Sequence, residues 1–444
     1  MGQDGPMEQP IPSPAEDTVR IITDLIRIDT SNDGTDDGPG EVLAAEYVVE
    51  LLREVGYDPE LITTTSGRRA AVALRIPGTS SEQPALLLHG HLDVVPAVAA
   101  DWTVPPFAAE VIDDMVWGRG AVDMKDMDAM ILAVIRSWAR EGYRPPRDVV
   151  VLFTPDEEAG GRHGAHWLVE NRPDLFTGVT EAVGEVGGFS LTVRDDLRLY
   201  LIQTAEKGIA WMRLTAAGRA GHGSMLNDHN AVSHLASAMS RIGSHRFDSS
   251  LGPTAQRLLA EICEAYGIDL NGNEVDEVMH QLGPIARFIG SGMRNTINPT
   301  MLEAGYKVNV IPEYAVGHVD GRFVPGGRDD LVDTARRLAG PDIDIDILTE
   351  DVALDVPFEG PTIEAMRAAL QTEDPHAHAI PYLMSGGTDA KAFSRLGITG
   401  YGFAPLRLPP DLDFAALFHG IDERVPLSAL RFGVVVLDRF LRTC

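Results

Sequence analysis

The stretch LLLHGHLDVVP, residues 86–96, joins a run of leucines to three side chains that prefer water or a metal ion: His89, His91 and Asp93. Leu86, Leu87 and Leu88 are continuously apolar, as expected of a strand that is buried on both faces. Similar short apolar runs occur at 70–76, 148–154 and 181–186, and helical patterns lie between them at about 124–140 and 162–171. Strands that alternate with helices predict a mostly parallel sheet with helices on both faces.

Polar side chains follow several of these strands. Ligands of such sheets bind beyond the carboxyl ends of the strands, where His91 and Asp93 follow one strand and Glu157 and Glu158 follow another. Taken singly, each has an ordinary explanation, such as a polar loop or the solvated start of a helix. The combined set contains histidines and several carboxylates: His91, Asp93, Asp123, Glu157, Glu158, Glu185 and His419. A pair of divalent metal ions bridged by a carboxylate requires this inventory.

Composition and charge limit the classes of function. Hydrophobic residues make up 44% of the 444 residues and charged residues 23%, as in ordinary globular proteins. The formal charge of −29 argues against nucleic acid and anionic membranes as partners, because both need a positive face. No apolar run is long enough to span a membrane. The sequence contains Cys263 and Cys444 in no paired pattern, and residues 1–16 have no signal-peptide features, so we expect a cytoplasmic protein with a flexible lead-in.

The chain is too long for one hydrophobic core, and its pattern changes near residue 205. We expect a catalytic domain over 17–204 and 353–444, interrupted by an inserted α+β sandwich over 205–352. Within the insert, 303–312 and 314–325 are expected to form a hairpin, and 245–300 is long and partly helical.

Seven short motifs, in this order along the chain, resemble a known family: HGHLDVVP, GRGAVDMK, TPDEEAGG, AGHGS, NVIP, SGGTDA and FHGIDERVP. They are similar to the signatures of the co-catalytic zinc family of aminoacylase, carboxypeptidase G and succinyl-diaminopimelate desuccinylase. The resemblance extends from about residue 17 to 440. It implies an α/β catalytic domain interrupted by a smaller lid or dimerisation domain, in agreement with the pattern of strands and helices.

The resemblance implies two divalent metal ions, with Zn²⁺ favoured and Co²⁺ or Mn²⁺ as alternatives. His91 and Glu185 would bind one ion, Glu158 and His419 the other, and Asp123 would bridge both. Imidazole and carboxylate ligands with an open coordination position are typical of catalytic zinc.

The remaining residues of this region have other expected roles. Asp93 would accept the second N–H of the His91 imidazole and so fix its tautomer. Glu157 would be the general base that takes a proton from the metal-bound water. If Glu185 were not a ligand, Glu181 would be the nearest substitute.

The inserted domain contributes a second set of residues through the resemblance. His222 would reach across a homodimer interface to polarise the substrate carbonyl. Arg322 and Asn309, with the backbone near Gly387, would bind a terminal carboxylate. For Arg322 the alternative is a structural ion pair within the lid.

These residues together predict a metal-dependent hydrolase of an amide or peptide bond next to a free carboxylate, in a dipeptide or an N-acyl amino acid. One alternative is a non-catalytic small-molecule-binding or scaffold protein on the same fold. Another is a hydrolase of a carbamoyl or ester bond, because a metal ion interacts in the same way with any of these carbonyl groups.

Overall fold

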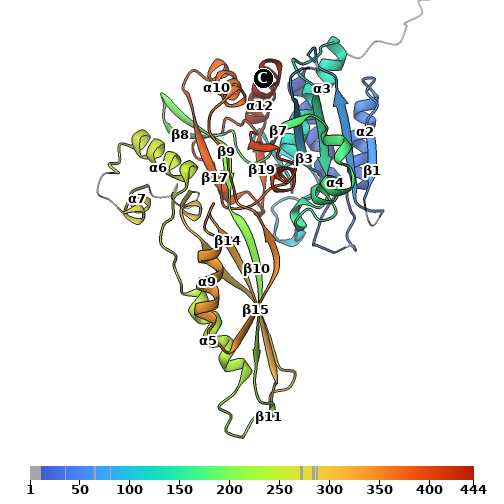
Figure 1. Ribbon diagram of the computed structural model, residues 1–444. Helices are drawn as coiled ribbons and strands as arrows, with labels where there is room; N and C mark the ends of the chain where they lie inside the picture. Colours follow the sequence, from blue (N-terminus) through green and yellow to red (C-terminus); the bar gives the residue numbers. More distant parts are fainter. Residues whose placement is uncertain are drawn as a thin grey trace, which may run out of the picture. The chain divides into compact units, whose positions relative to one another are not determined.

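The computed structural model describes residues 12–35, 37–64, 67–80, 82–270, 274–282, 286 and 289–444 (Figure 1). The chain forms two compact units. The first contains residues up to Ile202, Glu359–Ala379 and Ala392–Cys444, and the second contains Gln203–Phe358 and Ile380–Lys391. Residues 380–391 thus group with the second unit, although the sequence pattern placed them with the catalytic domain. The catalytic and lid roles of the two units stay predictions.

The first unit is built on a large sheet whose centre is parallel. β3 (Ala85–His91) lies between β6 (Val149–Thr154) and β7 (Val179–Gly184), and it is parallel to both. β18 (Thr399–Gly402) continues the parallel part beside β7. The flanking strands include antiparallel pairs, and those that lie in the first unit are β1 (Glu60–Thr63), β2 (Ala70–Ile76) and β8 (Phe189–Arg194). β9 (Leu197–Glu206) and β17 (Ala377–Met384) begin in the first unit and end in the second, and β16 (Leu354–Asp355) lies in the second. This arrangement confirms the mixed α/β fold with a parallel centre.

Helices cover both faces of this sheet. Alternate residues of a strand point in opposite directions, and the central strands β3 and β6 are buried at every position, so both faces need a helical cover. Leu87 of β3 packs with residues of α4 (Ala165–Asn171) and with Phe393 of α11 (Ala390–Ser394). The opposite face is covered by α3 (Lys125–Glu141), which contacts β3, and by α2 (Val42–Arg53), which contacts β2. The outer helices are α1 (Pro14–Arg27), α10 (Pro361–Glu373) and α12 (Leu427–Thr443).

A small antiparallel sheet joins two distant segments of the first unit. β5 (Met115–Trp117) pairs with β4 (Glu110–Ile112) on one side and with β19 (Arg424–Pro426) on the other. The residues that follow β5 therefore lie beside the residues that precede β19.

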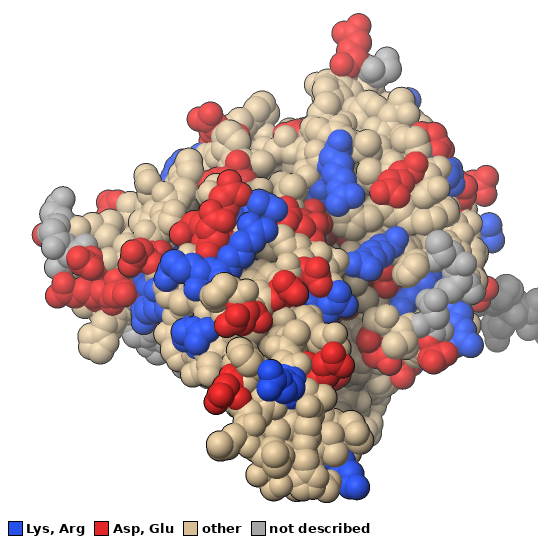
Figure 2. All heavy atoms as spheres, turned by 60° about the horizontal axis from the view of Figure 1, so that its bottom comes forward, with Lys and Arg blue, Asp and Glu red and all other residues tan. Residues whose placement is uncertain are grey.

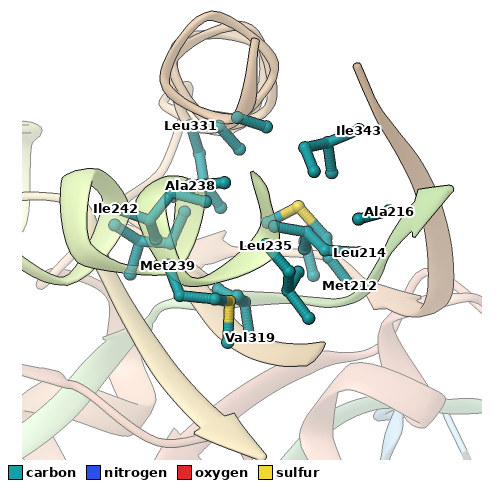
Figure 3. Close-up of a cluster of buried hydrophobic side chains, with 14 of the residues drawn as sticks. Met212, Leu214, Ala216, Leu235, Ala238, Met239, Ile242, Val319, Leu331 and Ile343 are labelled. Atoms are coloured by element: carbon teal, nitrogen blue, oxygen red, sulfur yellow. The ribbon is translucent and has the colours of Figure 1, made fainter. Parts of the chain in front are cut away.

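The second unit is a four-stranded antiparallel sheet with helices on one face. Its strand order is β12 (Thr296–Ala304), β14 (Tyr314–Phe323), β10 (Gly208–Ala217) and β15 (Ile343–Asp351). α5 (Ala231–Gly243) and α9 (Arg328–Ala339) lie along one face of it (Figure 1). Figure 3 shows the core between them, where Met212 and Leu214 of β10 point toward Leu235 and Met239 of α5. α6 (Pro253–Tyr266) and α7 (Val275–Leu282) fill part of the 245–300 segment.

The predicted hairpin of this unit is wrong in its first strand. The strand that precedes β14 and pairs with it is β12, which ends at Ala304, so most of 303–312 is not in that sheet. Gly305 has a φ of +71°, a conformation that ends the extended strand. Further along, β13 (Val310–Ile311) pairs with β11 (Gly221–His222) instead.

Candidate metal centre

The predicted metal ligands of the first unit lie at the carboxyl ends of three adjacent strands. His91 is the last residue of β3, Glu158 lies in the 3₁₀ turn η2 (Glu157–Ala159) after β6, and Glu185 directly follows β7. Because β6, β3 and β7 are parallel neighbours, their carboxyl ends meet at one edge of the sheet. Asp123 precedes α3, and His419 precedes β19.

The structure brings these five side chains together. His91 Nε2 lies 3.2 Å from Asp123 Oδ1 and 3.2 Å from Glu185 Oε2. His419 Nε2 lies 3.2 Å from Asp123 Oδ2 and 3.0 Å from Glu158 Oε2. The two oxygens of Asp123 therefore face different histidines, each of which has its own further carboxylate. This is the pairing that the resemblance implies, and the ligand roles themselves stay predictions.

Glu181, the alternative to Glu185, has other partners. Its carboxylate is 2.6 Å from Arg147 NH1 and accepts a 2.7 Å hydrogen bond from Thr362 Oγ1. Glu181 lies within β7, and these contacts hold it away from the carboxyl end of the sheet. Of the two residues, Glu185 is the one beside His91.

The electrostatics of the cluster indicate a strong demand for positive charge. Burial acts to lower the pKa of His91, but Glu185 and Asp123 raise it well above its usual value. Hydrogen bonds with Asp123 and Glu158 raise the pKa of His419 to about 10. Burial raises the pKa of Glu185 to about 8 and also raises that of Glu158. A nearby cation would favour the charged form of these buried carboxylates.

The donor set fits divalent metal ions. Ligand atoms of His91, Asp123 and Glu158 lie within 4.8 Å of one another, and so do those of His91, Glu157 and Glu185. Glu158 Oε1 is buried and has no hydrogen-bond partner among the described residues, so this atom is available to a cation. Imidazole nitrogens with carboxylate oxygens suit zinc, cobalt and manganese alike.

Asp93 differs from the expectation in which of its atoms contacts His91. The backbone oxygen of Asp93 is 2.9 Å from His91 Nδ1, whereas its carboxylate is 3.7 Å away. The carboxylate instead accepts the backbone N–H groups of Glu157 and Glu158, at 3.1 and 3.0 Å. Asp93 also accepts a 2.8 Å bond from Asn32 Nδ2. It therefore holds both the histidine ring and the turn that carries the two glutamates.

Glu157 is placed beside the ligands rather than between them. Its Oε2 lies 3.9 Å from His91 Nε2, and its side chain is 13% exposed. Glu158 points to His419, so the two adjacent glutamates face different parts of the cluster. Asp156 begins the turn that carries both glutamates. It has a φ of +69°, and its carboxylate accepts the backbone N–H of His163 at 2.8 Å.

Two residues predicted in the insert are neighbours within the second unit. His222 of β11 pairs with Val310 of β13, and the Gly223 N–H donates to the Asn309 oxygen at 2.9 Å. His222 is exposed, and its Nδ1 lies 2.8 Å from Ser224 Oγ. Asn309 is exposed as well.

The other two residues have partners within the same unit. Arg322 forms a two-pronged ion pair with Asp320, with N–O distances of 2.7 and 3.1 Å. This is the structural ion pair weighed as the alternative for Arg322. Gly387 packs on the buried Lys391, because a Cβ at 387 would lie 2.4 Å from Lys391 Cε.

Sequence reasoning missed two buried residues beside the cluster, Glu423 and Arg119. Glu423 is fully buried, and Arg119 NH1 lies 2.7 Å from it. Both lie inside quoted motifs, FHGIDERVP and GRGAVDMK. The signal that could have revealed this ion pair is an acidic residue in one motif and a basic residue in the other.

Comparison with known proteins now adds to this geometry. Residues 87–443 match Peptidase family M20/M25/M40. The chain belongs to this family. It is therefore a metal-dependent peptide or amide hydrolase, and the predicted family resemblance is confirmed.

Relatives cover most of this M20 peptidase. Aminoacylase-1 of Sus scrofa is 25% identical over 442 residues, which are 96% of this chain and 94% of that protein. Probable carboxypeptidase S-like 2 of Dictyostelium discoideum is 28% identical over 367 residues, 77% of this chain and 68% of that protein. An M20 family metallo-carboxypeptidase, Sso-CP2 from Sulfolobus solfataricus, has a TM-score of 0.72 at 17% identity and covers 96% of this chain and 98% of its own. This last likeness shows the fold.

Proposed function

We propose that this M20 peptidase hydrolyses the amide bond of dipeptides or N-acyl amino acids next to a free carboxylate, with Glu157 as the general base. The observation that carries the proposal is the position of Glu157, a carboxylate 3.9 Å from His91 and beside the five predicted metal ligands. A small-molecule receptor would not need this additional carboxylate. The substrate class is supported by relatives named aminoacylase-1 and carboxypeptidase S-like 2.

His91 and Glu185 would hold one divalent ion, Glu158 and His419 the other, and Asp123 both. When bound, the ions supply an electrophile that polarises the substrate carbonyl and an activated water. We propose zinc as the metal, since the donors are imidazole and carboxylate.

Glu157 would move the proton during the reaction. Its carboxylate takes a proton from the attacking water and returns it to the leaving amine nitrogen. The backbone N–H of Glu157 is held by Asp93, which orients the base before substrate binds.

Residues of the second unit would act on the substrate. We propose that His222 of one subunit polarises the carbonyl bound by its partner in a homodimer, and that Asn309, Arg322 and the backbone at Gly387 bind the carboxylate. For Arg322 this would require exchange of its ion pair with Asp320 for the substrate carboxylate. Exposed apolar side chains of the second unit support a protein partner there: Met225, Leu226, Met301, Leu302, Tyr306, Val308 and Tyr314.

We also propose that the enzyme works in the cytoplasm, because both of its cysteines are free thiols, as is usual in a reducing compartment. Among the described residues, no helix is both long and apolar enough to cross a membrane.

The first experiment is mass-spectrometric detection of products from a pool of dipeptides, N-acyl and N-carbamoyl amino acids. Zinc-loaded wild type is compared with Glu157→Ala and with Glu170→Gln, a control that changes an exposed glutamate of α4. We expect cleavage by the wild type and the control, and metal-loaded but inactive Glu157→Ala. Cleavage of only the N-carbamoyl members would move the assignment to a carbamoyl hydrolase, and no cleavage at all would favour the binding-protein alternative.

Mixing two inactive variants tests the role of His222 in the partner subunit. A dimer of Glu157→Ala with His222→Ala has one site with both residues intact if His222 acts on the partner's site. Random mixing gives half mixed dimers with one working site of two, so about a quarter of wild-type activity should return. No recovery in a mixture shown to exchange subunits would mean that His222 acts within its own chain or not at all.

A further inference from the structure

The buried carboxylate of Glu423 connects the two loops that carry Asp123 and His419. Glu423 lies four residues after His419, and its side chain has no solvent exposure. Its Oε1 accepts the backbone N–H of Val122 at 2.7 Å. Its Oε2 accepts the backbone N–H of Gly120 at 3.0 Å and Arg119 NH1 at 2.7 Å. Both of its carboxylate oxygens are therefore occupied by hydrogen-bond donors from the other loop.

The donors belong to the turn that leads directly into Asp123. Gly120 has a φ of +84°, so the chain turns sharply here before α3 begins at Lys125. The Gly118 N–H donates to the backbone oxygen of Glu423 at 2.9 Å. Buried backbone N–H groups need acceptors, and the backbone and side chain of Glu423 provide acceptors for three of them in this turn.

Arg119 extends the connection to His419. Its NH2 group donates to the backbone oxygen of His419 at 3.4 Å, while its NH1 group binds Glu423. The guanidinium carbon lies 5.1 Å from the centre of the Trp102 ring, which covers the pair. His419 has a φ of +56°, and this backbone conformation persists only where the surroundings fix it.

We propose that Glu423 is a positioning residue that fixes Asp123 relative to His419, so that the ion shared by Asp123, Glu158 and His419 binds tightly. This inference rests on the metal centre of the proposed function. By contrast, His91 ends β3 and Glu185 directly follows β7, and within the described part of the chain the Glu423 carboxylate is hydrogen-bonded to Arg119, Gly120 and Val122 and to neither of them. Loss of Glu423 should therefore weaken one ion more than the other.

The decisive variant is Glu423→Gln, which keeps the volume of the side chain. An amide has one acceptor oxygen, and its NH₂ group would face donors that it cannot satisfy. Asp422→Asn is the matched control, because Asp422 lies in the same loop but accepts bonds from Thr103 N and Oγ1, at 2.8 and 2.6 Å, away from Asp123. Glu423→Asp retains both oxygens on a shorter side chain.

The measurement is a Co²⁺ titration of the full chain without substrate, followed by the visible spectrum of the bound cobalt and by the metal content. It is made at pH 8, since burial raises the pKa of Glu423 to about 7. For Glu423→Gln we expect one of two ions to bind about 10–100-fold more weakly with an altered spectrum, and the other, which shares Asp123 but has His91 and Glu185 as its further ligands, to be weakened less. Glu423→Asp should fall between the wild type and Glu423→Gln, and Asp422→Asn should match the wild type.

An unchanged titration of folded Glu423→Gln would overturn the proposal, and so would equal weakening of both ions or a wild type that binds fewer than two ions. If Glu423→Gln does not fold, Glu423→Asp decides by the same criterion. Because no substrate is used, a wild type that binds two ions but cleaves nothing in the pool would defeat the proposed function and leave this inference standing.

Discussion

Asp93 shows how one residue can organise the predicted ligands through hydrogen bonds. Its carboxylate accepts the N–H groups of Glu157 and Glu158, and its backbone oxygen faces His91 Nδ1. Its Oδ2 also accepts Asn32, which in turn accepts Arg69 NH2 at 2.8 Å. A buried polar network of this kind supports the predicted base, Glu157, and two of the predicted ligands at once.

Asp93→Asn should therefore weaken metal binding while the fold is kept. The amide oxygen can replace one carboxylate oxygen, but the NH₂ group would then face a backbone N–H of the glutamate turn. We expect about a 10–100-fold loss of metal affinity, measured by competition with a chelator. Asp58→Asn, which changes an exposed loop residue, is the control. Wild-type affinity in Asp93→Asn would show that the turn is held by other contacts.

At this scale the sequence predicts which residues meet, because strand order and motif spacing place them at one edge of the sheet. It does not predict which atoms bond. His91 and Glu185 are 94 positions apart, and Arg119 and Glu423 are 304 apart. Contacts over such separations depend on the packing of the turns between them, so the roles of the Asp93 carboxylate and of Glu423 could only be read from the structure.

Among the elements, β7 is constrained where it delivers Glu185. A Cβ on Gly184, the last residue of the strand, would lie 2.2 Å from His89 Cε1. His89 is buried and packs edge-on against Phe393, with ring centres 4.9 Å apart, so the ring has little room to move.

Gly184→Ala should cost about 1–3 kcal/mol of unfolding free energy, as expected for overpacking of a core. It should also lower metal affinity by displacing Glu185. Denaturant unfolding and a metal titration measure the two effects. Gly178→Ala is the comparison, since a Cβ at that position would meet open space. The cost there comes only from the left-handed backbone, which has a φ of +75°. That variant should lose about 1 kcal/mol and bind metal normally. Equal metal affinity in the two variants would show that Gly184 does not affect the position of Glu185.

The contact between the end of α10 and β9 predicts how the unfolding free energy of the first unit depends on pH in acid. Asp374 at the end of α10 is buried, which would raise its pKa, but bonds from Arg198 and Tyr200 of β9 and from the His376 N–H lower the pKa to about 2. The depressed pKa contributes roughly 2 kcal/mol above pH 4. That contribution is lost as pH falls toward 2. In Asp374→Asn, unfolding free energy should therefore fall at pH 7 and depend less on pH between 5 and 2. A parallel pH dependence in both proteins would contradict this.

The sequence predicted whether a segment is a helix or a strand where a regular apolar pattern extended over many residues. The run at 70–76 is β2, and the helical pattern at 124–140 is α3. The pattern failed where the chain turned between two sheets, as at 303–312, because an alternating sequence does not specify its partner strand. No strand was predicted at 189–206, where the structure has β8 and β9.

The whole molecule carries a formal net charge of −29. On the face seen in Figure 2, acidic and basic side chains are intermixed, and no large area has one sign. Three carboxylates also lie close together beside His91 and His419: Asp123, Glu158 and Glu185. The sequence predicted the mixed α/β fold, but not that 380–391 would group with the second unit, because the boundary falls inside one continuous apolar strand, β17 (Ala377–Met384).

Removal of metal should therefore destabilise the protein, and the effect should grow with pH. Divalent ions at a thousand times their Kd add about 4 kcal/mol, or roughly 10 °C in Tm for a unit of this size. Without metal, burial raises the pKa of Glu185 to about 8, so at pH 6 an ion must displace its proton. A raised carboxyl pKa also means that the metal-free protein loses stability as pH rises from about 4.5 to 8.

Both effects act in the same direction, so the Tm difference between metal-loaded and chelator-treated protein should be larger at pH 8.5 than at pH 6. Differential scanning calorimetry at the two pH values measures it. Glu185→Gln removes the titrating group and should reduce the pH dependence of the difference, whereas Glu181→Gln, four residues earlier and bound to Arg147, should retain it. A difference that shrinks as pH rises would mean that Glu185 is not among the groups that exchange a proton for the metal.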